Sequence, residues 1–308
     1  MQNAGFRITD TSTLFATLEL WLEALQARRV SHRTLQSYRE YVTPFVEFLN
    51  QQHCHSLEDV QPQHIRRWLL HRQQQGISSH TLFNCYRNPR AFWNWCIREG
   101  LTENNPFAKV EPPKKEQVLK RALTPEEVEK LLQACEGKHW LRLRDRALIL
   151  LLLDTGLRIH EAHSLRVCDV AQDVVVIKGK GGKRRIVHLS PEVRLTIQRY
   201  LKAYQTQQGM NLQAESPLWH GDRGALTLEG CKVAVRKAGK RAGLTLGAHQ
   251  LRRTFATWSL RSGIDLEHLR LLMGHSDYKV LQQYIALVEQ DLKTAHEAHS
   301  PLRLLRRK

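Results

Sequence analysis

The chain has 308 residues, of which 42% are hydrophobic and 25% are charged, the composition of an ordinary globular protein with room for two modest cores. Its 47 lysines and arginines outnumber its 30 acidic residues and give a net charge of +17, so the expected partner is a polyanion, most simply nucleic acid. The apolar run Ala147–Leu153 is too short to span a bilayer, and no signal peptide or lipid anchor is recognisable, which argues against the membrane-bound classes.

The six cysteines are scattered along the chain and form no CxxC pair. This pattern is typical of a reduced, intracellular protein rather than of a disulfide framework. Together with the positive charge, it predicts a cytoplasmic protein associated with the nucleoid.

The positive charge is concentrated in the second part of the chain. Residues 1–103 contain eleven arginines, no lysine and nine acidic residues, a net charge near +2. The other residues contain 36 basic and 21 acidic side chains, a net charge near +15. The strongest attraction for a polyanion is therefore expected after residue 103.

After an extension at 1–10, residues 11–103 are expected to form a small four-helix domain. Apolar residues recur at helical spacing in two series, which are Leu14, Leu18, Trp21, Leu22 and Leu25, then Leu35, Tyr38, Val42, Phe45 and Leu49. Ser31 is expected to cap the second of these helices.

Two further helices are expected in the same domain, near Pro62–Gln75 and near Ser79–Glu99. Gly76 and Gly100 are expected to end them. Pro89 lies inside the last of these segments, where a proline should kink or split the helix.

Residues 104–122 contain two adjacent prolines and a basic run, which favour an extended linker. Thr124 and Pro125 then open a helix, and a second domain is expected over 123–300. Two β-branched runs, Asp173–Gly179 and Arg184–Leu189, predict a hairpin with a glycine-rich tip. Residues 301–308 form a basic and apolar tail, and a helix expected just before it is a candidate to dock on a neighbouring copy.

Four short segments of the second domain contain residues suited to phosphate chemistry. Arg158 lies in Thr155-Gly156-Leu157-Arg158, with Glu161 three residues later to orient its guanidinium. Lys180 lies between glycines at the hairpin tip. Each of these residues taken alone is as compatible with a surface salt bridge or a solvated turn as with a ligand site.

The other two segments follow later in the chain. His249 and Arg252 are spaced to share one helical face and can therefore reach one ligand. His275 follows Gly274, which is expected to end the helix Leu266–Met273, and Tyr284 lies nine residues after His275. Alone, the pair His249 and Arg252 would be an exposed polar face, and Tyr284 a half-buried aromatic.

Taken together, the four segments resemble the catalytic motifs of the tyrosine recombinases, the family of phage-type integrases and Xer-type resolvases. The resemblance covers the whole chain and implies a mainly α fold with a small β-sheet, built from a helical, SAM-like core-binding domain and an α/β catalytic domain. It also implies that Arg158, Lys180, His249, Arg252 and His275 surround the scissile phosphate and that Tyr284 is the nucleophile.

The chemistry of these residue types is consistent with that resemblance. Two arginines can neutralise a phosphodiester without a metal ion, and a lysine can protonate the leaving oxygen. A covalent phosphotyrosyl link would conserve the bond energy, so we expect neither a metal nor another cofactor such as ATP. The expected partners are double-stranded DNA with an inverted-repeat core site and further copies of the chain, two on one site and four in a synapse. An accessory protein would be a further partner of unspecified identity.

Three residues depart from the family pattern, namely His160, His163 and Arg253. They remove no expected catalytic group, but their effect on packing or specificity is left open. Two other functions remain alternatives: a type IB topoisomerase-like enzyme that relaxes DNA, and a basic DNA-binding protein without catalytic activity. The sequence does not separate integration or excision of a mobile element from resolution of DNA dimers.

Overall fold

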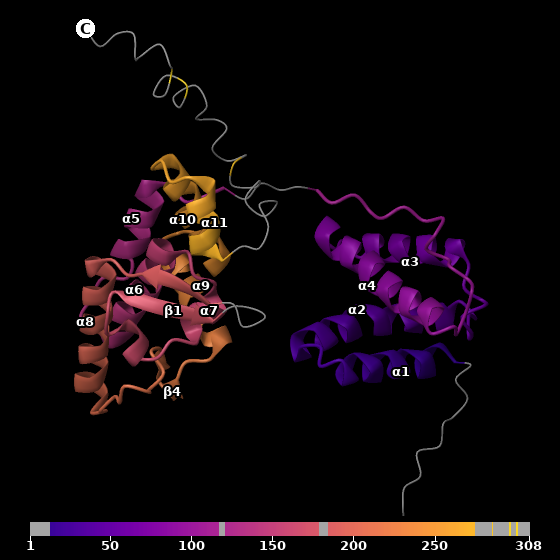
Figure 1. Ribbon diagram of the computed structural model, residues 1–308, viewed down its shortest axis with the longest axis horizontal. Coiled ribbons are helices and arrows are strands. Elements are labelled where there is room, and N and C mark those ends of the chain that lie inside the picture. Colours follow the sequence, from indigo (N-terminus) through magenta and orange to yellow (C-terminus); the bar gives the residue numbers. More distant parts are fainter. Residues whose placement is uncertain are drawn as a thin grey trace, which may run out of the picture. The chain divides into compact units, whose positions relative to one another are not determined.

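The protein is described from a computed structural model that covers residues 13–116, 121–178 and 184–274, together with 285, 296 and 300. The chain divides into two compact units, residues 1–118 and 119–308 (Figure 1). The predicted fold class is confirmed, because helices dominate both units and the described strands form only small two-stranded sheets. No helix within the described ranges is long and apolar enough to cross a membrane.

The first unit contains four helices: α1 (Leu14–Ala27), α2 (His32–Gln51), α3 (Pro62–Gln74) and α4 (Ser79–Arg98). Ser31 caps α2 as predicted, since its hydroxyl accepts a hydrogen bond from the backbone N–H of Thr34. The two series of apolar residues face the core, where Trp21, Phe45 and Phe92 are almost completely buried. This unit therefore has a hydrophobic core of its own.

Pro89 does not split α4, which runs unbroken from Ser79 to Arg98. A proline inside a helix leaves the carbonyl four residues earlier without its usual partner. Here that carbonyl belongs to Cys85 and accepts a hydrogen bond from the indole N–H of Trp68, at 3.0 Å. The neighbouring helix thus replaces the missing bond, and Pro89 itself is buried.

The expected linker at 104–122 is extended only in part, because its first residues pack on the first unit. Phe107 and Val110 are buried in the core of that unit. The backbone oxygens of Asn104 and Val110 accept hydrogen bonds from the buried side chains of Trp93 and Tyr86. The expectation of an unpacked segment was wrong here because two apolar side chains outweigh the prolines that follow them.

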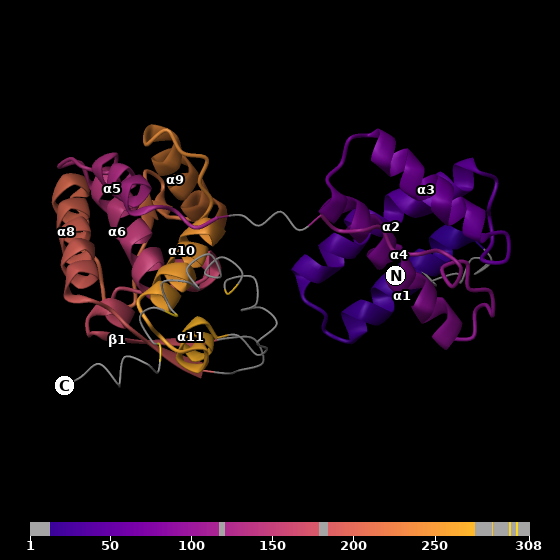
Figure 2. The ribbon, with the colours of Figure 1, turned by 90° about the horizontal axis from the view of Figure 1, so that it is seen from above.

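The second unit is built around helix α6 (Trp140–Thr155), whose apolar residues are buried almost all round. Helices α8 (Pro191–Gln208), α9 (Leu228–Arg241) and α10 (Ala248–Arg261) contact it (Figure 2). Helix α5 (Pro125–Gln133) begins at the predicted cap, where Thr124 and Glu127 form a reciprocal capping box. Because α6 is buried, it fixes the position of the residues that follow its C-terminus.

The predicted hairpin is present, since strands β1 (Val174–Lys178) and β2 (Arg184–His188) pair antiparallel with Lys178 opposite Arg184. Its tip, residues 179–183, lies outside the described residues. The remaining elements of the second unit are α7 (Ile159–His163), the 3-10 helix η1 (Cys168–Val170), α11 (Leu266–Met273) and the short pair β3 (His220–Gly221) and β4 (Gly224–Ala225).

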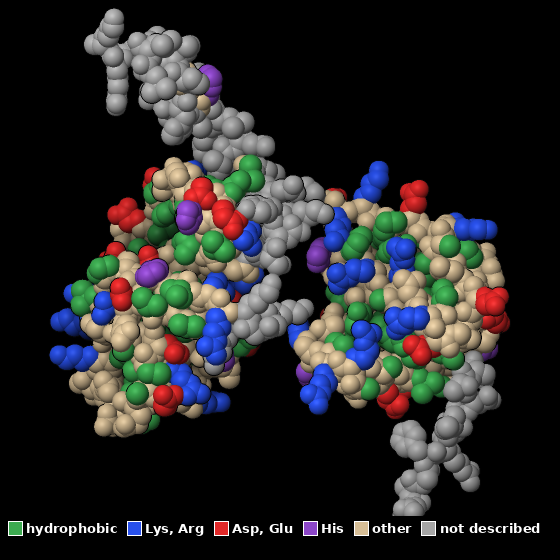
Figure 3. All heavy atoms as spheres, in the orientation of Figure 1, with side chains coloured by type: hydrophobic (Ala, Val, Ile, Leu, Met, Phe, Trp, Pro, Cys, Tyr) green, Lys and Arg blue, Asp and Glu red, His purple; other side chains and the backbone are tan. Residues whose placement is uncertain are grey.

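Lysine and arginine side chains occur on the visible face of each unit, interspersed with acidic side chains (Figure 3). On the face shown, the acidic side chains of each unit are scattered and do not gather into one patch. Each unit thus presents cations to solvent, as expected of a protein with a net charge of +17.

Candidate active site

The site begins where α6 ends. The hydroxyl of Thr155 donates to the backbone oxygen of Leu151 at 2.6 Å and accepts from the N–H of Leu157 at 3.3 Å. Gly156 ends the helix in the left-handed region, with φ of 61°. A Cβ at Gly156 would lie 2.2 Å from Cδ1 of Phe255, so only glycine fits this turn. The turn directs the chain into α7, which starts after Arg158.

Arg158 and Glu161 form a capping box at the start of α7. The backbone N–H of Arg158 donates to Oε2 of Glu161 at 2.7 Å, and its Nη1 lies 3.2 Å from Oε1. The side chain of Glu161 is 2% exposed, whereas that of Arg158 is 36% exposed. The contact expected from the three-residue spacing is therefore present, with a buried carboxylate holding a partly exposed guanidinium.

Arg252 is buried in the same place, although it comes from α10. Its Nη1 donates to the backbone oxygen of Gly156, and its Nη2 donates to that of Met273 at 2.7 Å. Nη1 of Arg158 approaches the same Met273 oxygen at 3.5 Å. The two arginines that the sequence singled out therefore converge at the C-terminal end of α11, where the negative end of the helix dipole favours cations.

His249 lies in the first turn of α10, one helical turn before Arg252, and its side chain is exposed. The capping residue Gly247 has no side chain to cover this turn, so the start of the helix remains accessible. Arg252 is thus fixed within the fold, and His249 lies at its edge.

Arg185 is a charged residue of this cluster that the sequence reasoning did not identify. It lies on β2, and its guanidinium forms a two-point contact with Glu161, from Nη1 to Oε1 at 2.9 Å and from Nη2 to Oε2 at 2.8 Å. Its Nε donates to the backbone oxygen of Leu272 at 2.9 Å. A signal was available, because β2 alternates and Arg185 falls in line with the buried residues Val187 and Leu189.

The two guanidinium groups keep Glu161 ionised. Burial, the largest single influence, raises the pKa of its carboxyl group. The hydrogen bonds from Arg185 and from the backbone of Arg158, with the charges of both arginines, outweigh burial and hold the pKa at about 2. Glu161 is therefore an anion at neutral pH and partly offsets the positive charge of the cluster.

Three of the predicted site residues, Lys180, His275 and Tyr284, lie outside the described residues. The flanking structure is described for His275: α11 ends, as predicted, at Gly274 in the left-handed conformation, with φ of 62°. A Cβ at Gly274 would lie 2.9 Å from Nη1 of Arg185, so the close approach of that guanidinium also requires glycine here.

Comparison with known families settles the relationship. The model of the phage integrase family matches residues 121–291, and that of the phage integrase N-terminal SAM-like domain matches residues 18–100. The chain belongs to the phage integrase family. The tyrosine recombinase XerC of Bacillus subtilis is 30% identical over 293 residues, which cover 92% of this chain and 96% of that protein. The predicted membership of the tyrosine recombinases, and with it the prediction of a site-specific recombinase enzyme, is confirmed at the level of the family.

Solved structures show the same fold at low identity. A lambda integrase dimer bound to a COC′ core site is 20% identical, has a TM-score of 0.70, and matches 88% of this chain and 95% of its own. The Tn1549 transposon integrase in complex with transposon right end DNA is 21% identical, also has a TM-score of 0.70, and matches 92% of this chain and 99% of its own. These likenesses support the predicted two-part integrase fold.

The residues that depart from the family pattern lie on α7 and α10, the elements next to the cluster. Nε2 of His163 lies 3.0 Å from the backbone oxygen of Leu226, and this contact joins α7 to the segment before α9. His160 is exposed, and Arg253 is buried. Among the described residues, no group of three or more His, Cys, Asp or Glu side chains is arranged to hold a metal ion.

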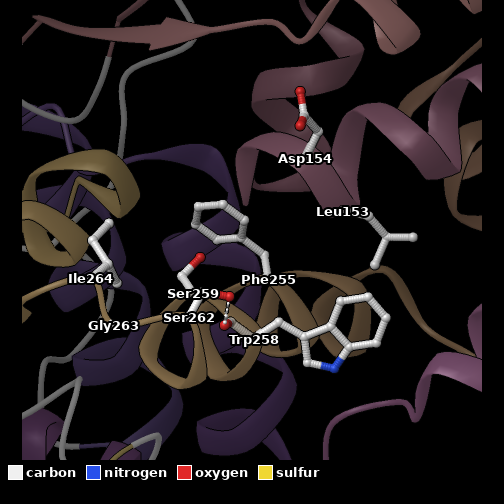
Figure 4. A pocket seen from close by; sticks show the side chains of 8 residues that line it. All are labelled: Leu153, Asp154, Phe255, Trp258, Ser259, Ser262, Gly263 and Ile264. Carbon is white, nitrogen blue, oxygen red and sulfur yellow. Dashed lines mark hydrogen bonds between the residues drawn. The ribbon is translucent and has the colours of Figure 1, made fainter.

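The tyrosine recombinase also has a groove of about 590 Å³ between the end of α6 and the C-terminal half of α10 (Figure 4). It is lined by Leu153, Asp154, Phe255, Trp258, Ser259, Ser262, Gly263 and Ile264. Of the predicted catalytic residues that the structure describes, Arg158, His249 and Arg252, none lines this groove. Phe255 links the groove to the site, because its ring also packs on Gly156.

Proposed function

We propose that the protein is a site-specific DNA recombinase that cleaves and rejoins DNA strands through a 3′-phosphotyrosyl intermediate, with Tyr284 as the nucleophile. The observation that carries this proposal is the convergence of Arg158 and Arg252 on the backbone oxygen of Met273. Two guanidinium groups held this close, one from the N-cap of α7 and one from α10, form a site for one doubly contacted anion. A phosphodiester of duplex DNA is the anion that fits the family and the net charge of +17.

The proposed reaction transfers the scissile phosphate of DNA from its 5′ oxygen to the phenol oxygen of Tyr284. The phenol oxygen of Tyr284 attacks phosphorus, its proton leaves to a base, and the bond to the 5′ oxygen breaks. Arg158 and Arg252 stabilise the charge that develops on the equatorial oxygens. Lys180 protonates the 5′ oxygen, and His249 and His275 assist the proton transfers. Attack by a second 5′ hydroxyl reverses these steps and seals the new strand.

The energy of the broken bond is kept in the phosphotyrosyl link, so the proposed reaction uses neither ATP nor a resident metal ion. The two arginines and the lysine supply the positive charge that a metal ion would otherwise provide. Glu161 contributes by holding the guanidinium of Arg158 from behind.

The proposed partner is double-stranded DNA with an inverted-repeat core site. Two copies of the chain would occupy one site, and four would assemble a synapse of two sites. Two solved structures of one relative support this arrangement, since lambda integrase has been seen as a dimer bound to a COC′ core site and as a tetramer bound to a Holliday junction. We propose strand exchange between such core sites as the reaction used in integration, excision or resolution of dimers, in the cytoplasm and at the nucleoid.

The proposal can be tested by covalent trapping on DNA. The substrate is a pool of duplexes with a randomised core and a nick next to each candidate cleavage position. The nick prevents religation after cleavage. The protein therefore stays covalently attached to DNA when sodium dodecyl sulfate is added. The wild type should yield adducts, whereas Tyr284→Phe should bind the selected duplexes and yield none. Adducts formed equally by Tyr284→Phe would refute Tyr284 as nucleophile. Relaxation of plasmids that lack the selected site would instead favour a topoisomerase.

A further inference from the structure

Arg185 occupies an unusual place for an arginine, on the core-facing side of a strand. In the register of the hairpin it lies opposite Ile177, and its neighbours on the same side are the buried residues Val187 and Leu189. Its side chain is only 12% exposed. Burying a guanidinium costs free energy unless its hydrogen bonds are satisfied. The contacts that Arg185 makes therefore indicate the role of its side chain.

The first contact, with Glu161, determines which arginine neutralises the charge of that carboxylate. Arg185 makes two hydrogen bonds to the carboxylate, at 2.8 and 2.9 Å, whereas the side chain of Arg158 makes one at 3.2 Å. A two-point guanidinium–carboxylate pair is stronger than a single, longer contact. Arg185 therefore neutralises most of the buried charge. Within the described part of the chain, the guanidinium of Arg158 is held only through Nη1.

The second contact fixes the end of α11. Nε of Arg185 donates to the backbone oxygen of Leu272, and the guanidinium lies against Gly274. These residues adjoin the Met273 oxygen on which Arg158 and Arg252 converge. One side chain thus joins the hairpin strand, the start of α7 and the end of α11.

We propose that Arg185 is a positioning residue for cleavage, which occupies Glu161 so that Arg158 remains available to the phosphate, and which holds the end of α11 next to Arg252. The inference rests on the proposed function. Without Arg185, the buried carboxylate would have Arg158 as its remaining guanidinium partner. Arg158 would close onto it, and the phosphate would lose one of its two arginines.

The test separates cleavage from binding on one duplex selected by covalent trapping from the nicked random pool. Rates of adduct formation are measured with all DNA bound, and half-site affinities are measured by gel shift. The variants are Arg185→Gln, Arg185→Lys and the double variant Glu161→Gln/Arg185→Gln. Arg184→Gln is the matched control, because it removes one charge from the same strand but from its exposed side.

Arg185→Gln should slow cleavage on the order of 100-fold, the usual cost of losing one group that stabilises transition-state charge, without a change in half-site affinity. The double variant should be at least about tenfold faster than Arg185→Gln, because removal of the carboxylate releases Arg158. A purely structural role predicts the opposite order, since the double variant has lost more contacts. Arg184→Gln should cleave bound DNA at the wild-type rate.

The inference would be overturned if Arg185→Gln cleaved at the wild-type rate. It would also be overturned if the double variant cleaved no faster than Arg185→Gln. If Arg185→Gln does not fold, Arg185→Lys carries the test, because one ammonium group cannot bridge both Glu161 oxygens and the Leu272 oxygen. It should be slower than the wild type at equal affinity, and an equal rate would overturn the inference. A wild type that forms no adduct with any duplex of the pool would refute the proposed function itself, which distinguishes the two failures.

Discussion

The two arginines of the candidate site differ in how the fold holds them. Arg252 is 1% exposed and donates to two backbone oxygens from different segments. The side chain of Arg158 is 36% exposed and depends on Glu161, which is itself held by Arg185. Because the guanidinium of Arg158 is partly exposed, its orientation depends on the residues behind it. This is the reason that the buried carboxylate Glu161 matters to the site.

The stability of Glu161 in its ionised form gives a pH-dependent prediction. The pKa of its carboxyl group is about 2 in the folded protein and 4.5 ordinarily. Because the folded value is lowered, the stabilisation is fully present above pH 4.5 and is lost as the pH falls toward 2. Glu161→Gln should therefore cost about 3–5 kcal/mol at neutral pH, as for one partner removed from a buried ion pair. The cost should shrink as denaturation is measured at lower pH.

Glu127 provides a matched control for that measurement. The hydrogen bonds of its carboxyl group, first of all with Arg121, also lower its pKa to about 2, and it too sits in a capping box. Its partner Arg121 is 62% exposed, so solvent screens the pair. Glu127→Gln should cost at most about 1 kcal/mol. Equal costs for the two substitutions at neutral pH would contradict the special position assigned to Glu161.

At the scale of elements, the end of α6 and the end of α8 offer a comparison of two glycine caps. Gly156 and Gly209 have nearly the same φ, 61° and 62°. Nothing lies within 4 Å of a Cβ at Gly209, whereas one at Gly156 would meet the ring of Phe255. Gly209→Ala should cost roughly 1 kcal/mol for the left-handed conformation alone. Gly156→Ala should cost about 1–3 kcal/mol more, because the added methyl group would overpack the core there.

Thermal denaturation of the two variants would check this, with cleavage measured on the same samples. Gly156→Ala should also reduce cleavage, since the Gly156 carbonyl is a partner of Arg252. If Gly156→Ala proved as stable as Gly209→Ala, the packing of Phe255 on this turn would be the wrong explanation for the glycine.

The helices were predictable because their apolar residues repeat at helical spacing and their caps have recognisable residues such as Ser31 and Thr124. The hairpin followed from its β-branched strands. The packing of Phe107 and the continuity of α4 through Pro89 could not be predicted, because each depends on a partner distant in sequence. For Pro89 that partner is Trp68, twenty-one residues earlier on another helix.

The same distinction applies to the site. The spacing in the chain predicted the contact of Arg158 with Glu161, because three residues along a helix are neighbours. The convergence of Arg158 and Arg252 could be expected only from the family resemblance, since Arg158 precedes α7 and Arg252 lies on α10. Arg185 was missed because a charged residue next to another in Arg184–Arg185 looks like a solvated strand end. The alternation along the strand, which places Arg185 on the side of Val187 and Leu189, was the signal that distinguishes the two, and the structure confirms it.

For the whole molecule, the division of charge between the two parts of the chain bears on how it meets DNA. Residues 1–103 have a net charge near +2 and the rest near +15. The second part should therefore supply most of the attraction, and the first part should contribute through shape and individual contacts.

That division predicts a steep dependence of binding on salt. Each neutralised phosphate adds about 0.9 to the slope of log K against log salt, so contacts with six to ten phosphates would give a slope of roughly −5 to −9. Filter binding or gel shifts from low to physiological salt would measure it. Residues 121–308 expressed alone should retain most of this slope. A nearly flat dependence of the full chain would contradict its proposed role as a recombinase of duplex DNA.

The most direct test of the central claim is to locate the covalent bond itself. Wild-type protein trapped on a nicked duplex is digested with trypsin and nuclease, and the modified peptide is sequenced by mass spectrometry. Cleavage after Lys279 and Lys293 places Tyr284 in the peptide 280–293, apart from Tyr278 in the preceding peptide. We expect a nucleotide on Tyr284 alone. A nucleotide on Tyr278 or on another residue, with Tyr284 unmodified, would contradict it.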